Sequence, residues 1–178
     1  MLKFSELVKQ LENQGFDLRI RDGLTCDEIE TLEEVIGSSF DDQTKHVYSL
    51  CGGQDPGAIP VFGRFRLLPP AEVIHMVEEM KIYPPFGKED PTGNERLHRD
   101  RFWRSGWLFF AKDVHGMYLI VDFSPRKPDY AGHIFLWNPE TPFDETVATS
   151  VKHLVELSMA WDNESNDYFE PIPLNSIS

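Results

Sequence analysis

The sequence predicts one α+β domain, in which an antiparallel meander of strands packs against several helices. Two observations lead to this fold class. Apolar residues recur at helical spacing through the first half of the chain and again near its end. Between these stretches lie short runs rich in β-forming residues, separated by links too short for a crossover helix. Helices followed by a meander and a last helix indicate an α+β domain.

Helices are expected from the apolar spacing and from signals at the helix ends. Thr25 precedes Glu28 by three residues, which is the capping-box pattern, and Gly37 ends the apolar stripe behind it. Asp41 and Asp42 stand where a helix dipole favours negative charge. The expected helices cover approximately residues 4–14, 26–36, 70–80 and 150–161, with a further helix that runs from residue 41 or 42 to the glycines at 52–53.

Strands are expected where β-forming residues cluster. The link Asp113-Val114-His115-Gly116 is short enough for a tight hairpin, and Gly116 is free to adopt a positive φ. A second short link covers residues 125–132, and together the two links favour an antiparallel meander. The expected strands cover residues 64–68, 107–111, 117–123, 133–137 and 145–148.

The segment before the first long strand differs in composition. Residues 83–95 contain three prolines, two glycines and four charged residues, which predicts a long loop. Residues 95–104 carry four arginines and two acids beside aromatic rings. This composition is typical of a protein interface or an RNA contact. We favour the commoner alternative, a solvated face with internal salt bridges and two buried aromatic rings.

The chain is strongly acidic, and the acidity is concentrated towards its ends. Its 30 Asp and Glu against 17 Lys and Arg give a formal net charge of −13. Residues 37–138 are almost neutral, whereas residues 1–36 hold 9 acids and 4 bases and residues 139–178 hold 8 acids and 1 base. Acidic surfaces repel phosphate backbones and anionic lipid, so we expect a basic protein partner and no direct binding to nucleic acid.

Neither membrane insertion nor disulfide cross-linking is expected. No apolar run reaches the roughly 20 residues of a membrane span, and the N-terminus lacks the basic and apolar regions of a secretory signal. Cys26 and Cys51 are too few for a disulfide scaffold, and no His stands beside them at zinc-ligand spacing. We therefore expect reduced thiols and a cytoplasmic location.

Sequence motifs for catalysis are absent. The chain has no G-x-S-x-G elbow, no phosphate loop and no H-E-x-x-H pair, so we expect no catalytic residue, no cofactor and no metal. One set of polar residues suggests an alternative, a catalytic or metal-binding site: Asp113, His115 and Asp122. Facing each other across the hairpin, the two carboxylates would suit metal binding or acid–base chemistry. The commoner role of such aspartates is to bind backbone N–H groups in turns, which we favour.

The order of these elements resembles the SUKH superfamily, the domain of fungal regulators of cell-wall glucan synthesis and of many bacterial immunity proteins. The resemblance covers residues 23–161 and implies a SUKH-like α+β domain there. Residues 1–22 would form an N-terminal helical extension, and residues 162–178 an acidic C-terminal tail. The family motif is carried by Gly106, Trp107, Asp113, Gly116, Asp122, Pro125 and Trp137.

The resemblance implies protein binding without catalysis. The first expectation is an immunity-type protein that neutralises a toxin by binding it, basic nucleases being one class of such toxins. The alternatives are a regulatory scaffold for cell-wall or envelope synthesis and, less favoured, a small-ligand or metal-dependent hydrolase using Asp113, His115 and Asp122. The oligomeric state, the partner and the source organism stay open.

Residues that contact the partner are expected in the segments where relatives vary, because loops carry function more often than scaffold elements do. The candidates are Phe86, Lys88, Glu89, Asp90, Arg99, Arg101, Asp162, Glu164 and Asp167.

Overall fold

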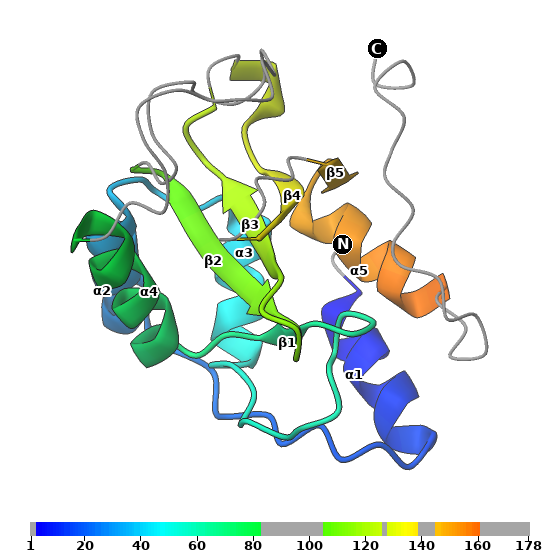
Figure 1. The fold of residues 1–178 in the computed structure, drawn as a ribbon. Coiled ribbons are helices and arrows are strands. Elements are labelled where there is room, and N and C mark those ends of the chain that lie inside the picture. The colour runs from blue at the N-terminus through cyan, green and yellow to red at the C-terminus, as the bar shows by residue number, and fades with distance from the viewer. Residues whose placement is uncertain (1–2, 83–104, 126–127, 139–144, 161–178) are drawn as a thin grey trace.

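A computed structural model describes residues 3–82, 105–125, 128–138 and 145–160 (Figure 1). Within these residues each expected helix and strand is present, and the α+β class is confirmed. The expected loop at 83–95 and the stretch at 95–104 lie outside the described residues. The helices are α1 (Phe4–Asn13), α2 (Cys26–Ile36), α3 (Asp42–Leu50), α4 (Pro70–Ile82) and α5 (Val151–Ala160), with one short 3-10 turn, η1 (Pro128–Tyr130).

The strands form one antiparallel sheet in sequence order, β1-β2-β3-β4-β5, so the predicted meander is confirmed. The pairing of β2 with β3 contains an irregularity between Phe109 and Ala111. The strands are β1 (Arg66–Leu67), β2 (Trp107–Lys112), β3 (Tyr118–Asp122), β4 (His133–Trp137) and β5 (Glu145–Ala148).

The helices flank the sheet in two groups. Figure 1 shows α2 and α4 side by side on one flank and α1 and α5 on the other, with α3 behind the strands. Helix α4 packs against β2, whereas α5 packs against β4 and β5. The helices therefore hold the meander from two sides.

The central strands are buried on both faces, because their apolar residues run without alternation. Phe109 on β2 meets Trp137 edge to face, with ring centroids 5.6 Å apart. The next residue, Phe110, points to the opposite face and lies 5.9 Å from the ring of Tyr48 on α3. Two aromatic layers thus stabilise the sheet, in keeping with the favourable edge-to-face geometry of such pairs.

The N-terminal segment contributes to the same hydrophobic core. Phe4 and Leu7 on α1 are buried, and the ring of Phe4 lies 6.0 Å from that of Phe62. The Gln10 side chain donates a hydrogen bond to the carbonyl of Met159 on α5, at 3.4 Å. Helix α1 is therefore packed on the domain rather than projecting from it.

Local signals explain where the helices begin and end. The predicted capping box is confirmed, since the Thr25 hydroxyl accepts from the Glu28 N–H while the Glu28 carboxylate accepts from the Thr25 N–H. Gly37 ends α2 in the left-handed conformation, with φ +76°. Asp41 caps α3 by accepting from the Thr44 N–H at 2.7 Å.

Candidate protein-binding surface

Asp113, His115 and Asp122 do not form one site. A hairpin pairs residues that lie equally far from its turn, so Asp113 meets Met117 beside the turn, where its N–H donates to the Met117 carbonyl at 3.0 Å. Asp122 instead pairs with Trp107 at the far end of the β2–β3 ladder. The two carboxylates are thus separated by the length of the strands, and the expectation that they face each other is wrong.

Both aspartates serve the turns, as the favoured interpretation predicted. Oδ1 of Asp113 accepts from the N–H groups of His115 and Met117, both at 2.8 Å. Oδ1 of Asp122 accepts from the N–H of Ser124 at 2.9 Å. Because these carboxylates bind backbone at opposite ends of a hairpin, the hydrolase alternative loses the convergent geometry on which it depended.

The other positions of the family motif have structural roles. Trp107 and Trp137 are buried, Pro125 is half-buried, and Gly116 adopts φ +82° in the hairpin turn. Gly106 adopts φ +95°, and a Cβ there would lie 2.0 Å from the hydroxyl of Ser124. These residues shape the hairpin and its core rather than an exposed site.

Gln54 is a buried hub that the sequence analysis did not single out. Its Nε2 donates to the carbonyls of Leu18 and Ile59 at 2.7 and 2.8 Å. Its Oε1 accepts from the N–H groups of Val61 and Leu67 at 3.0 and 3.2 Å. The buried amide is therefore fully hydrogen-bonded and ties three segments together. No sequence motif predicts a buried glutamine at this position. The only local signal is that Gln54 follows two glycines.

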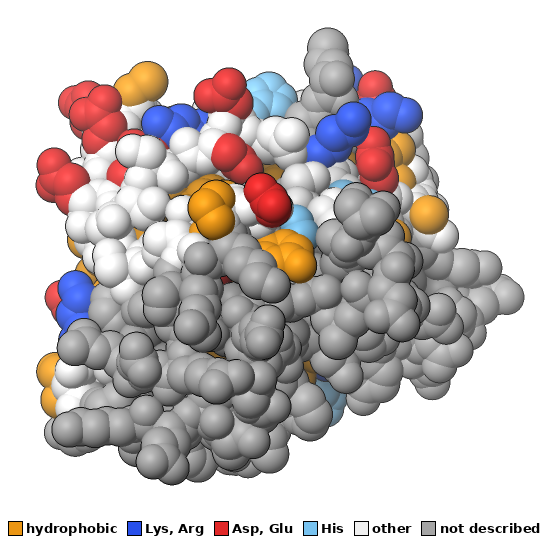
Figure 2. All heavy atoms as spheres, turned by 90° about the horizontal axis from the view of Figure 1, so that it is seen from above, with side chains coloured by type: hydrophobic (Ala, Val, Ile, Leu, Met, Phe, Trp, Pro, Cys, Tyr) orange, Lys and Arg blue, Asp and Glu red, His pale blue; other side chains and the backbone are white. Residues whose placement is uncertain are grey.

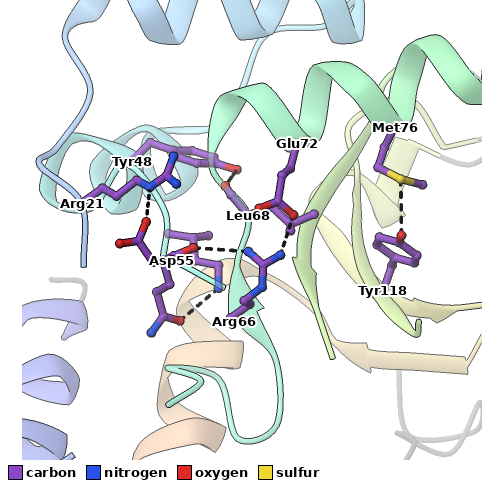
Figure 3. A network of polar contacts seen from close by, with 10 residues as sticks. Arg21, Tyr48, Asp55, Arg66, Leu68, Glu72, Met76 and Tyr118 are labelled. Atoms are coloured by element: carbon purple, nitrogen blue, oxygen red, sulfur yellow. Dashed lines mark hydrogen bonds and ion pairs between the residues drawn. The ribbon is translucent and has the colours of Figure 1, made fainter. Parts of the chain in front are cut away.

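Arg66 connects the Gln54 network to helix α4, because it binds both Gln54 and Glu72 (Figure 3). Its Nη1 donates to the Gln54 carbonyl at 3.2 Å, and its Nη2 pairs with the Glu72 carboxylate at 2.5 Å. A second ion pair, Arg21 with Asp55, is about half exposed on both sides. The second pair contributes little to stability because water screens it, whereas the first fixes the start of α4 against β1.

Helix α2 concentrates negative charge, with five acids and no base among its eleven residues. Two of the acids act locally. The Thr25 backbone N–H, and then its hydroxyl, donate to Glu28 and hold the pKa of that carboxyl below its usual value. Glu33 pairs with Lys45 of α3 at 3.0 Å, and this hydrogen bond raises the pKa of the lysine.

The remaining acids of α2 point outward. Asp27, Glu30 and Glu34 are exposed, and their spacing of three and four residues places them along one side of the helix. Glu78 and Glu79 are exposed on the neighbouring helix α4. Figure 2 shows acidic side chains at the left edge of the described surface, on the side where Figure 1 places α2 and α4. We refer to these five exposed acids, Asp27, Glu30, Glu34, Glu78 and Glu79, as the acidic flank.

The predicted contact residues lie elsewhere in the chain, outside the described residues. They are Phe86, Lys88, Glu89, Asp90, Arg99, Arg101, Asp162, Glu164 and Asp167. Their role as contacts stays a prediction.

In residues 3–82, 105–125, 128–138 and 145–160, no three His, Cys, Asp or Glu side chains are grouped so as to hold a metal ion. In the same part of the chain, no helix has both the length and the apolar character needed to cross a bilayer. Both cysteines are free, Cys26 exposed and Cys51 buried.

The described residues form an α+β domain with a five-stranded meander and helices on both flanks, and two aspartates of the family motif bind backbone at opposite ends of the β2–β3 hairpin. Residues 23–156 match the model of the SMI1 / KNR4 family (SUKH-1), so the chain belongs to this family. No curated protein gives a significant sequence match to the chain. SUKH domains are in general non-enzymatic immunity or regulatory proteins.

Proposed function

We propose that the chain is an immunity-type protein that binds and neutralises a basic toxin domain inside the cell. The observation that carries the proposal is membership of the SUKH-1 family, whose domains act through protein partners. The net charge of −13 supports a basic partner. The proposed mechanism is occlusion, in which the bound chain covers the surface that the toxin needs for its own substrate.

Charge explains how such a complex would form quickly. A nuclease or another phosphate-binding toxin carries Lys and Arg in its cleft, and an acidic surface competes for the same groups. Opposite charges also steer the encounter, which raises association rates by about 10-fold to 1,000-fold at low salt. The exposed acids Asp27, Glu30 and Glu34 of α2 are suited to this steering because they share one side of the helix.

Close contact in the complex is assigned to the variable segments. Of the nine predicted contact residues, Phe86 and Arg101 are the most informative, because aromatic and arginine side chains dominate binding hot spots. Replacing either by alanine is expected to weaken partner binding without unfolding the domain. A complex whose affinity is unchanged by both substitutions would remove these two residues from the interface.

The first experiment identifies the partner. The full chain, carrying an affinity tag, is used to capture proteins from its own cells at low salt and at about 1 M salt, where the Debye length is about 3 Å. The proposal predicts a basic partner that is retained at low salt and depleted at high salt. Capture of acidic or neutral proteins alone, or of none, would contradict it.

A matched pair of variants then tests the acidic flank. Glu30→Lys with Glu34→Lys reverses two exposed charges on α2, and Glu6→Lys with Glu12→Lys makes the same change on α1. The α2 variant is expected to slow association with the captured partner by about tenfold or more at low salt, and the α1 variant by much less. Equal effects would mean that net charge, and not the flank, steers binding.

The same capture distinguishes the regulatory alternative. A partner that belongs to envelope or cell-wall synthesis, and whose activity continues in the complex, would favour a scaffold role over neutralisation.

A further inference from the structure

A cleft of about 200 Å³ lies between helix α4 and the end of the β2–β3 ladder beside the hairpin turn, where Lys112 pairs with Tyr118. Its volume is below the roughly 300–1,000 Å³ of sites for cofactors and drug-sized ligands. A space of this size suits one long side chain. Its walls include Glu72, His75, Met76 and Glu79 from α4 together with Lys112 and Tyr118 from the sheet.

The pattern of α4 explains why polar groups line the cleft. Val73 and Val77 form the buried stripe of the helix. Glu72, Met76 and Glu79 recur at spacings of four and three residues and therefore share the adjoining side. Helix α4 thus uses one stripe for the core and presents to the cleft a second stripe that holds two glutamates, a histidine and a methionine.

Met76 and Tyr118 form the floor of the cleft, and contacts with the core fix the position of the tyrosine. The Tyr118 hydroxyl lies 3.3 Å from the sulfur of Met76, as Figure 3 shows. The Tyr118 ring meets Phe109 edge to face, with centroids 5.4 Å apart, and it also contacts Trp137 at 5.7 Å. Because the ring is packed into the core, the floor is formed before any partner arrives.

The charges around the floor leave one carboxylate suited to an incoming cation. Glu72 is already engaged by Arg66 at 2.5 Å. Glu79 is 51% exposed and lies 3.4 Å from His75, which gives a full ion pair only when the imidazole is protonated. Lys112 lies over the Tyr118 ring, with its amine 5.0 Å from the centroid, so this ring already receives a cation.

We propose that the cleft receives one arginine side chain of the basic partner. The apolar stem would lie along the half-buried Met76, and the guanidinium would bind the exposed Glu79 carboxylate. Arginine suits the site because its planar head pairs with a carboxylate through two parallel hydrogen bonds. This inference rests on the proposed function, since it names the chemical group that a basic partner would present.

The test uses the full chain with its methionine methyl groups labelled with ¹³C, observed by NMR at low salt. The probe is the capped peptide acetyl-Gly-Arg-Gly-amide. Its control is the same peptide with citrulline, which keeps the shape of arginine and removes the charge. The Met76 signal, assigned with Met76→Leu, is expected to shift and saturate with the arginine peptide, whereas the signal of Met159 on α5 stays in place.

Two neighbouring variants make the test specific to the cleft. Glu79→Gln removes the proposed carboxylate, and Glu78→Gln removes the same charge from an exposed neighbour that does not line the cleft. Glu79→Gln is expected to raise the dissociation constant of the arginine peptide about fivefold, and Glu78→Gln is expected to raise it less than twofold. Melting temperatures of both variants equal to that of the wild type would show that the fold is intact.

Three results would overturn the inference: no shift of Met76, equal shifts with the citrulline peptide, or equal effects of the two variants. None of them bears on the proposed function, because capture of a basic protein by the chain is measured separately. Conversely, a saturating arginine-specific shift would support the cleft even where no basic partner is captured.

Discussion

The guanidinium of Arg64 closes over a carboxylate that water cannot reach. Its Nη2 lies 3.1 Å from Oδ2 of Asp113, whose side chain is 0% exposed. The other carboxylate oxygen, Oδ1, accepts the N–H groups of His115 and Met117. The β2–β3 turn is therefore joined to the segment before β1 by an ion pair. The arrangement is structural, and it accounts for an aspartate in the family motif without assigning it any chemistry.

Asp113→Ala is expected to destabilise the fold by about 2–3 kcal/mol. The substitution removes the acceptor of two turn N–H groups and the carboxylate that pairs with Arg64. The cost stays below the 3–5 kcal/mol of a fully buried pair because Arg64 is 26% exposed and partly screened. Urea denaturation measures the change. Asp129→Ala, at an exposed position of η1, is the control and is expected within about 0.5 kcal/mol of wild type. Equal losses in the two variants would contradict the role of Asp113.

Trp107→Ala is expected to cost about 3–5 kcal/mol, the range for removing a large buried ring. Trp107 is 3% exposed and meets Phe135 edge to face at 4.9 Å. Val114→Ala is the control, because Val114 is 89% exposed at the hairpin turn. A thermal melt that hardly moves in the Trp107 variant would show that the ring does not support the core.

Thr25→Ala is expected to destabilise the domain by about 1 kcal/mol at pH 7, because it removes the hydroxyl that caps α2. Thr31→Ala on the same helix removes an exposed hydroxyl that caps nothing, and it is expected to cost less. Comparable losses in urea denaturation would contradict the capping role.

Acid should weaken the same cap through Glu28. Hydrogen bonds from Thr25 lower the pKa of Glu28 in the folded state. A group with a lowered folded pKa stabilises the fold above its unfolded pKa, about 4.3 for Glu, and this contribution is lost as the pH falls through the folded pKa. The stability difference between wild type and Glu28→Ala is therefore expected to shrink below about pH 4. A difference that stays constant into that range would contradict the assignment.

The two thiols are expected to differ in reactivity. Burial raises the pKa of the Cys51 thiol to about 11, so it stays protonated at pH 8, and the thiolate is the reactive form. Cys26 is exposed. An aromatic disulfide reagent should therefore label one thiol of the native protein at pH 8 and both in urea. Cys26→Ser should abolish native labelling; rapid labelling of that variant would contradict the burial of Cys51.

Local signals predicted most of the fold, because helices, caps and hairpin turns depend on residues close together in the chain. The capping box at Thr25 and Glu28 and the turn at Gly116 are examples. Features that depend on distant segments were missed or wrong. The separation of Asp113 from Asp122 depends on strand register, and the hydrogen bonds of Gln54 reach three segments. The cleft beside Met76 likewise joins a helix to two strands.

Neutralisation is the central claim, and growth measures it most directly. The basic protein captured by the chain would be expressed in a sensitive host alone, with the full chain, and with the double substitution Glu30→Lys and Glu34→Lys. The account predicts that the basic protein arrests growth, that the full chain restores it, and that the α2 variant restores it less well. Growth arrest that continues in the presence of the bound wild-type chain would contradict an immunity function.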